Sequence, residues 1–166
     1  MVANNRTVGK AVFQNGNSTV NILSSTFVDN IAGGSAAIVQ DEGAISVANS
    51  IFWGNTPMET LFSEVDVFSV RNSAIEDSDP NDDVIPFGGT ANGNIDDLPS
   101  FVDRAGNDFH INPGSPTIDA GDDSLLAIDV LDIDEDGDQT EAAPDLDLLD
   151  RIAGSSTDMG AFEFFA

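Results

Sequence analysis

The feature that most constrains the fold of this chain is an internal repeat in its first half. Segments 19–30, 44–55 and 67–77 read TVNILSSTFVDN, AISVANSIFWGN and VFSVRNSAIED, and they align without gaps. One serine column marks the copies at steps of 25 and 23 residues, at Ser25, Ser50 and Ser73. Units of this length cannot bury their own apolar face, so such copies stack on one another.

Each copy has the alternation that is typical of β-strands. Val20 and Ile22 stand two residues apart in the first copy, and the later copies repeat this spacing with β-branched or aromatic residues. Stacked strands lie about 4.8 Å apart. Residues of one column, such as Phe27 and Phe52, are therefore expected to be neighbours. Segments 9–14 and 35–40 also match, as an opening strand of two copies.

These patterns predict an all-β fold, a right-handed parallel β-helix of about three coils with an irregular C-terminal cap. Each coil would consist of two or three short strands joined by tight corners. A β-sandwich is the alternative, because short strands with regular turns occur there too. We assign residues 1–77 to the coils and residues 78–166 to a capping segment of the same domain, which carries an acidic loop at 129–150.

Two strings in the second half carry a family resemblance. GSPTIDAGD at 114–122 is followed downstream by DMGAFEF at 158–164. From about Phe87 to Phe164 the chain resembles the choice-of-anchor Q domain, which closes the C-terminal end of parallel β-helix proteins on bacterial surfaces. It departs from that family at Phe162, where tyrosine is common, and in DLLDRIAG. The resemblance implies a secreted or surface location and no shared catalytic activity.

Charge excludes several classes of function. The chain has 30 acidic and 5 basic residues and a formal net charge of −25, which repels nucleic acids and anionic membranes. We expect no nucleic-acid partner and no direct membrane insertion, since no apolar run is long enough to span a bilayer. Cysteine is absent, so disulfides and thiol chemistry are excluded.

The acidic loop is the candidate metal site. Asp132, Asp134 and Asp136 alternate and Gly137 follows, which matches the first six positions of an EF-hand loop. Position twelve is Ala143 instead of glutamate, so we expect Asp138 and Glu141, or else Asp145, to supply further oxygens to a Ca²⁺ ion. The alternative is a solvated acidic excursion. The run at 77–83 is a weaker candidate.

Residues for catalysis are few. His110 is the only histidine, and we expect it to face outward from a strand. Asp119 is expected to cap a turn and Arg151 to pair with carboxylates. Trp53 is expected to point outward and to be covered by the loop at 77–90.

We therefore predict a non-catalytic, extracellular structural or adhesive domain that calcium stabilises. Its expected partners are other copies, joined end to end, or surface glycans. The alternative is a module that binds or degrades polysaccharide, because carboxylate pairs suit glycoside hydrolysis.

Overall fold

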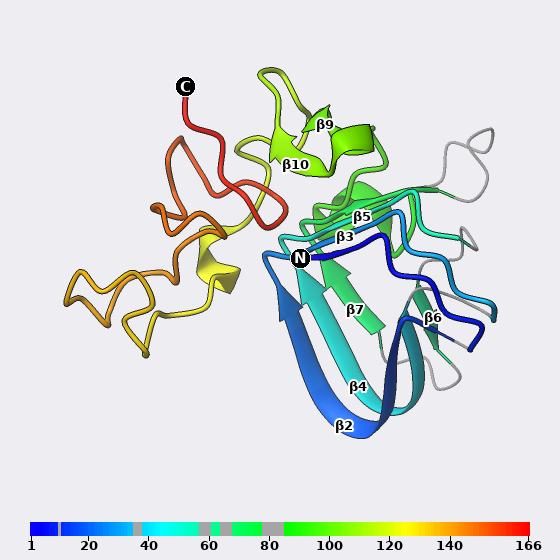
Figure 1. Cartoon of the computed structure of the whole chain (residues 1–166). Coiled ribbons are helices and arrows are strands. Elements are labelled where there is room, and N and C mark those ends of the chain that lie inside the picture. The colour runs from blue at the N-terminus through cyan, green and yellow to red at the C-terminus, as the bar shows by residue number, and fades with distance from the viewer. Residues whose placement is uncertain (10, 35–37, 57–60, 64–67, 78–84) are drawn as a thin grey trace.

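The computed structural model contains two parallel sheets and one antiparallel strand pair (Figure 1). Short 3₁₀ helices are the helical elements of the part that it describes. None of the helices in that part is long and apolar enough to span a membrane. The structure describes residues 1–9, 11–34, 38–56, 61–63, 68–77 and 85–166.

The first sheet has the order β1-β3-β5-β8 and stacks the end of each repeat copy on the next. Phe27 pairs with Phe52, and Phe52 pairs with Ile75, all in parallel register. The rings of Phe27 and Phe52 are stacked with centroids 4.9 Å apart. The strands are β1 (Val2–Ala3), β3 (Thr26–Val28), β5 (Ile51–Trp53) and β8 (Ala74–Ile75).

The second sheet contains two long, strongly curved strands. β2 (Phe13–Leu23) and β4 (Ile38–Ala48) are parallel and each has 11 residues. The far edge of β4 pairs first with β6 (Leu61–Ser63) and then with β7 (Phe68–Arg71). Figure 1 shows these strands bending through a wide arc below the first sheet.

The predicted fold class, a right-handed parallel β-helix of about three coils, is wrong. The structure instead has parallel sheets of the kind found in α/β-type folds, and one of them is a curled half-barrel. The prediction required several short strands with tight corners in each copy. β2 and β4 instead keep one parallel register from end to end of their 11 residues, and they bend gradually without a corner (Figure 1). The repeat columns themselves are confirmed by the strand register, as Val20 with Ile45 shows.

Polar side chains hold the turns between the two sheets. Nδ2 of Asn5 donates to Oδ1 of Asn30 at 3.0 Å, and Nδ2 of Asn30 donates to Oδ1 of Asn55 at 2.9 Å. The same carbonyl oxygens also accept the backbone N–H of Asn5 and Asn30. Ser50 and Ser73 act similarly, since each hydroxyl accepts the N–H of the serine one copy earlier. These contacts satisfy buried backbone donors that the sheets leave free.

The first sheet is buried on both faces. Phe27 and Phe52 face the curled sheet, and they pack with Ile22, Ile45 and Val47 in one core cluster. The next residues along the same strands face the opposite way, into a second cluster beneath the C-terminal segment. A parallel sheet that is covered on both faces has continuous apolar strands, and TFV and IFW fit that description.

Trp53 belongs to the second cluster and is buried, with 8% of its surface exposed. It does point away from the first cluster, as its alternation predicts. Its cover includes Phe109, Met159 and Phe162 from the C-terminal segment, and residues 78–84 of the predicted covering loop lie outside the described residues. Apolar residues more than fifty positions downstream therefore complete this core.

The C-terminal segment is irregular and covers the last strands. The backbone N–H of Asn72 donates to the carbonyl of Asn92, and Ala74 forms a parallel bridge with Ile95, which occupies the edge of β8. The elements of this segment are η1 (Gly89–Asn92), β9 (Phe101–Asp103), η2 (Arg104–Gly106), β10 (Asp108–Ile111) and η3 (Asp123–Leu125). β9 and β10 form the antiparallel pair.

Candidate functional site

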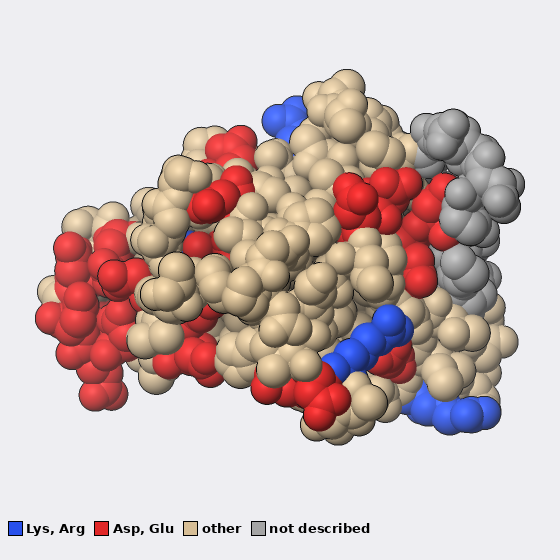
Figure 2. Space-filling view, turned by 90° about the horizontal axis from the view of Figure 1, so that it is seen from above, with Lys and Arg blue, Asp and Glu red and all other residues tan. Residues whose placement is uncertain are grey.

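An acidic lobe projects from one end of the molecule. Its chain is yellow to orange in Figure 1, and Figure 2 shows a dense group of Asp and Glu at the same end. From Thr117 to Asp150 the sequence contains thirteen acidic residues and no lysine or arginine. This lobe is the strongest concentration of ligand-type oxygens in the described part of the chain.

An antiparallel bridge closes the base of the loop. Ile128 pairs with Ala142, and the backbone N–H of Asp129 donates to the carbonyl of Glu141 at 3.0 Å. The N–H of Ala143 donates to the carbonyl of Ala127 at 2.8 Å. Ala143 is the twelfth position counted from Asp132, where an EF-hand loop has its bidentate glutamate. In this chain that position instead forms one of the backbone hydrogen bonds that close the loop. The loop is therefore a pinched turn and not a helix-flanked EF-hand.

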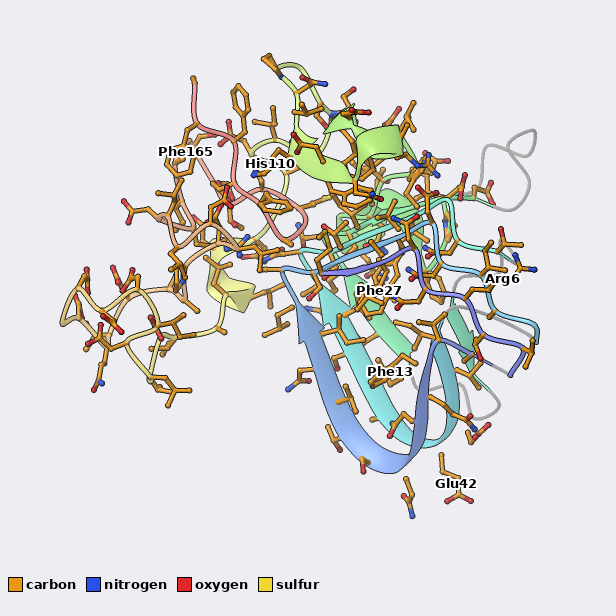
Figure 3. All side chains as sticks on the ribbon, in the orientation of Figure 1. Arg6, Phe13, Phe27, Glu42, His110 and Phe165 are labelled. Carbon is orange, nitrogen blue, oxygen red and sulfur yellow. The ribbon has the colours of Figure 1, made fainter. Side chains whose placement is uncertain are left out.

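The alternate aspartates converge as the sequence predicts. Asp132, Asp134 and Asp136 each place a carboxylate oxygen within 4.8 Å of the others. Asp132 has φ 53° and Gly137 has φ 94°, both in the left-handed region, which turns the backbone around the group. The N–H of Gly137 donates to Oδ1 of Asp132 at 3.0 Å. Figure 3 shows several carboxylate side chains on the yellow to orange loop at the left of the view.

Two further predicted ligands lie outside this group of three. Oδ1 of Asp138 accepts the N–H of Thr140 at 2.8 Å and its hydroxyl at 2.6 Å, and these bonds lower the pKa of Asp138. Glu141 stands at the base of the loop. Desolvation raises the pKa of Glu141, and the negative charges of Asp136 and Asp134 raise it further. Its carboxylate therefore experiences the charge of the cluster without joining it.

Asp129 is a functional candidate that the sequence analysis missed. Its side chain is 1% exposed, and Oδ2 accepts the N–H of Ile133 at 2.7 Å, between two of the converging aspartates. Oδ1 is buried and has no hydrogen-bond partner among the described residues. No spacing signal marks Asp129, because it stands outside the alternate run. The second acidic run, at 77–83, falls almost wholly outside the described residues.

Arg151 lies beneath the lobe, but its direct partners differ from the prediction. The guanidinium donates to the carbonyl oxygens of Pro144, Gly160 and Ala161 at 3.1 to 3.3 Å. Burial lowers the pKa of Arg151, while the charges of Asp145 and of other nearby carboxylates oppose that shift. The carboxylates thus stabilise the cation through space, and the carbonyls receive its hydrogen bonds.

Two buried acids accompany Arg151. Burial is the main cause that raises the pKa of Asp158, and it raises the pKa of Glu163 to about 7. The N–H of Asp158 donates to both carboxylate oxygens of Glu163, at 3.2 and 3.1 Å. Asp119 caps a turn as predicted, since Oδ1 accepts the N–H of Ser155 at 2.6 Å. These acids serve the structure of the segment.

His110 lies between two carboxylates. Nδ1 is 2.5 Å from Oδ1 of Asp108, and Nε2 is 2.7 Å from Oδ2 of Asp147. Both contacts raise the pKa of His110, the bond to Asp108 most strongly. The ring also packs on Phe162, with centroids 4.1 Å apart. With both nitrogens occupied, this imidazole ties β10 to the acidic segment and has no free nitrogen for proton transfer.

Comparisons with protein-family models, with curated proteins and with solved structures give no match for this chain.

Proposed function

We propose that this chain is a non-catalytic, extracellular structural or adhesive domain whose acidic loop binds Ca²⁺. The observation that carries the proposal is the convergence of Asp132, Asp134 and Asp136, whose carboxylate oxygens lie within 4.8 Å of one another. Calcium takes six to eight oxygen ligands at about 2.3–2.6 Å and accepts irregular geometry. Three carboxylates on one turn, with backbone carbonyls and water, suit those requirements.

The electrostatics of the loop support a cation in the same place. Carboxylates held this close repel one another. The pKa of nearby Glu141 is raised first by desolvation and then by the negative charges of Asp136 and Asp134. A divalent cation would turn the repulsion into attraction and would order the loop. The buried, unpartnered Oδ1 of Asp129 is a further oxygen that gains from a nearby positive charge.

An extracellular role fits the ion. Calcium sites built on few protein ligands have dissociation constants of about 10⁻⁴–10⁻³ M in extracellular modules. The loop meets this description, because its three converging carboxylates are partly exposed. Secretion and adhesion are thus part of the proposal, and the choice-of-anchor Q resemblance implies the same location.

Calorimetric titration with CaCl₂ tests the proposal. The chain should bind one ion, and the double variant Asp134→Asn/Asp136→Asn should lose the binding heat. The matched control is Glu42→Gln/Asp97→Asn, which removes the same charge at two exposed positions outside the lobe. Equal loss in both variants would mean that only the overall negative charge attracts calcium. No heat with the wild-type chain would refute the site.

A further inference from the structure

A groove runs between the acidic lobe and the end of β2. It consists of three hollows of about 240, 220 and 210 Å³, and Pro144 and Arg151 line all three. Because the hollows share these two residues, they lie next to one another as three separate hollows, and we call the three together the groove. Leu23 and Ser24, at the end of β2, line the second hollow and connect the groove to the sheet.

The first hollow has an aliphatic lining that is open to solvent. Met1, Ile133, Leu146 and Leu148 line it, and between 49% and 54% of the surface of each is exposed. Half-exposed aliphatic residues are ordinary when they are scattered, but a group that lines one concave site marks a binding surface. The lobe thus presents an apolar floor among its carboxylates.

The rim of the groove is negative. Asp134, Glu141 and Asp150 line the third hollow, and Asp145 lines the first. Arg151 is the basic residue of the groove, and its guanidinium donates to backbone carbonyls beside several carboxylates. Among the described lining residues, the lysine and arginine side chains of a ligand would find several carboxylates, which favours a cationic ligand over an anionic one.

The dimensions favour a peptide over a small molecule. Pockets for drug-sized ligands have volumes of about 300–1,000 Å³, and each hollow is smaller than that. Adjacent hollows of this size suit successive side chains of one extended segment. We propose that the groove binds a cationic peptide segment of a partner protein, with aliphatic side chains in the hollows and basic side chains on the rim. This inference goes beyond the calcium proposal and does not require the metal.

Fluorescence anisotropy with a labelled peptide of alternating lysine and leucine tests the inference on the full chain. A peptide with serine in place of each leucine measures attraction by charge alone. We expect the leucine peptide to bind at least tenfold more tightly than the serine peptide, and to do so with calcium or with chelator. Anionic lipid vesicles should not bind, and vesicle binding would overturn the peptide assignment.

Matched variants locate the binding. Leu146→Ser/Leu148→Asn should weaken binding of the leucine peptide at least tenfold, whereas Val130→Ser/Leu131→Ser should change it less than twofold. Val130 and Leu131 are also exposed aliphatic residues of the lobe, but they line none of the three hollows. The single change Leu148→Asn is a second test that suits the φ of 63° at this position. Similar effects of both double variants, or equal binding of the two peptides, would overturn the proposal.

Discussion

The buried carboxyl group of Glu163 contributes to the free energy of unfolding, and this contribution should fall as the pH rises toward neutrality. Its side chain is 6% exposed, and burial raises its pKa from 4.5 to about 7. The folded chain therefore holds this proton more tightly than the unfolded chain does. Its contribution to the free energy of unfolding is complete below pH 4.5 and decreases as the pH rises through 7. At 1.36 kcal/mol per pH unit, the whole decrease is about 3 kcal/mol.

The variant Glu163→Gln tests this directly, because glutamine resembles the protonated acid and does not titrate. Urea unfolding at several pH values between 4.5 and 8 should show a decline for the wild-type chain that is shallower for the variant. The two curves should converge toward pH 4.5, and the variant should be the more stable at pH 8. Glu42→Gln makes the same change at an exposed position and should leave the slope unchanged. Parallel curves for Glu163→Gln and the wild-type chain would refute the reasoning.

Two further predictions concern side chains that connect separate parts of the chain. The raised pKa of His110 means that its two carboxylate contacts stabilise the fold below pH 6.5 and that this contribution is lost as the pH rises through the folded pKa. His110→Gln should thus destabilise the protein at pH 5.5 and much less at pH 9 in urea unfolding, and an equal effect at both would contradict the ion pairs. Asn5, Asn30 and Asn55 form a hydrogen-bonded series, which we call the asparagine row. Asn30→Ala removes its fully buried middle member and should lower the free energy of unfolding by about 1–3 kcal/mol. Asn5→Ala, at the exposed end of the row, should cost less in thermal unfolding, and a reversed order would contradict the row as described.

The repeat allowed strand positions and register to be predicted. Val20 pairs with Ile45, and Phe27 with Phe52, because columns of like residues survive in the sequence. The opening strand was less well marked. The identity of Gln14 and Gln40 suggests a step of 26 residues, but Gln14 pairs with Val39 at a step of 25.

Strand curvature could not be read from the same columns. Alternation reports which side chains share a face, but it does not report whether the backbone turns at a corner or bends gradually.

The part of the site that is formed by residues close together in the sequence could be predicted. Asp132, Asp134 and Asp136 converge because they alternate on one turn, so spacing was a sufficient signal. Asp129, the cover over Trp53 and the groove depend on segments that meet only in the folded chain. No local pattern encodes such meetings.

A pair of thermal unfolding curves, one with millimolar calcium and one with chelator, tests the central claim most directly. At about 10 mM, roughly one hundred times a dissociation constant of about 10⁻⁴ M, calcium should stabilise the chain by about 2.7 kcal/mol. For a chain of this size the midpoint should rise by roughly 5–10 °C, and the rise should disappear in Asp134→Asn/Asp136→Asn. Coincident curves for the wild-type chain would contradict a calcium-ordered loop.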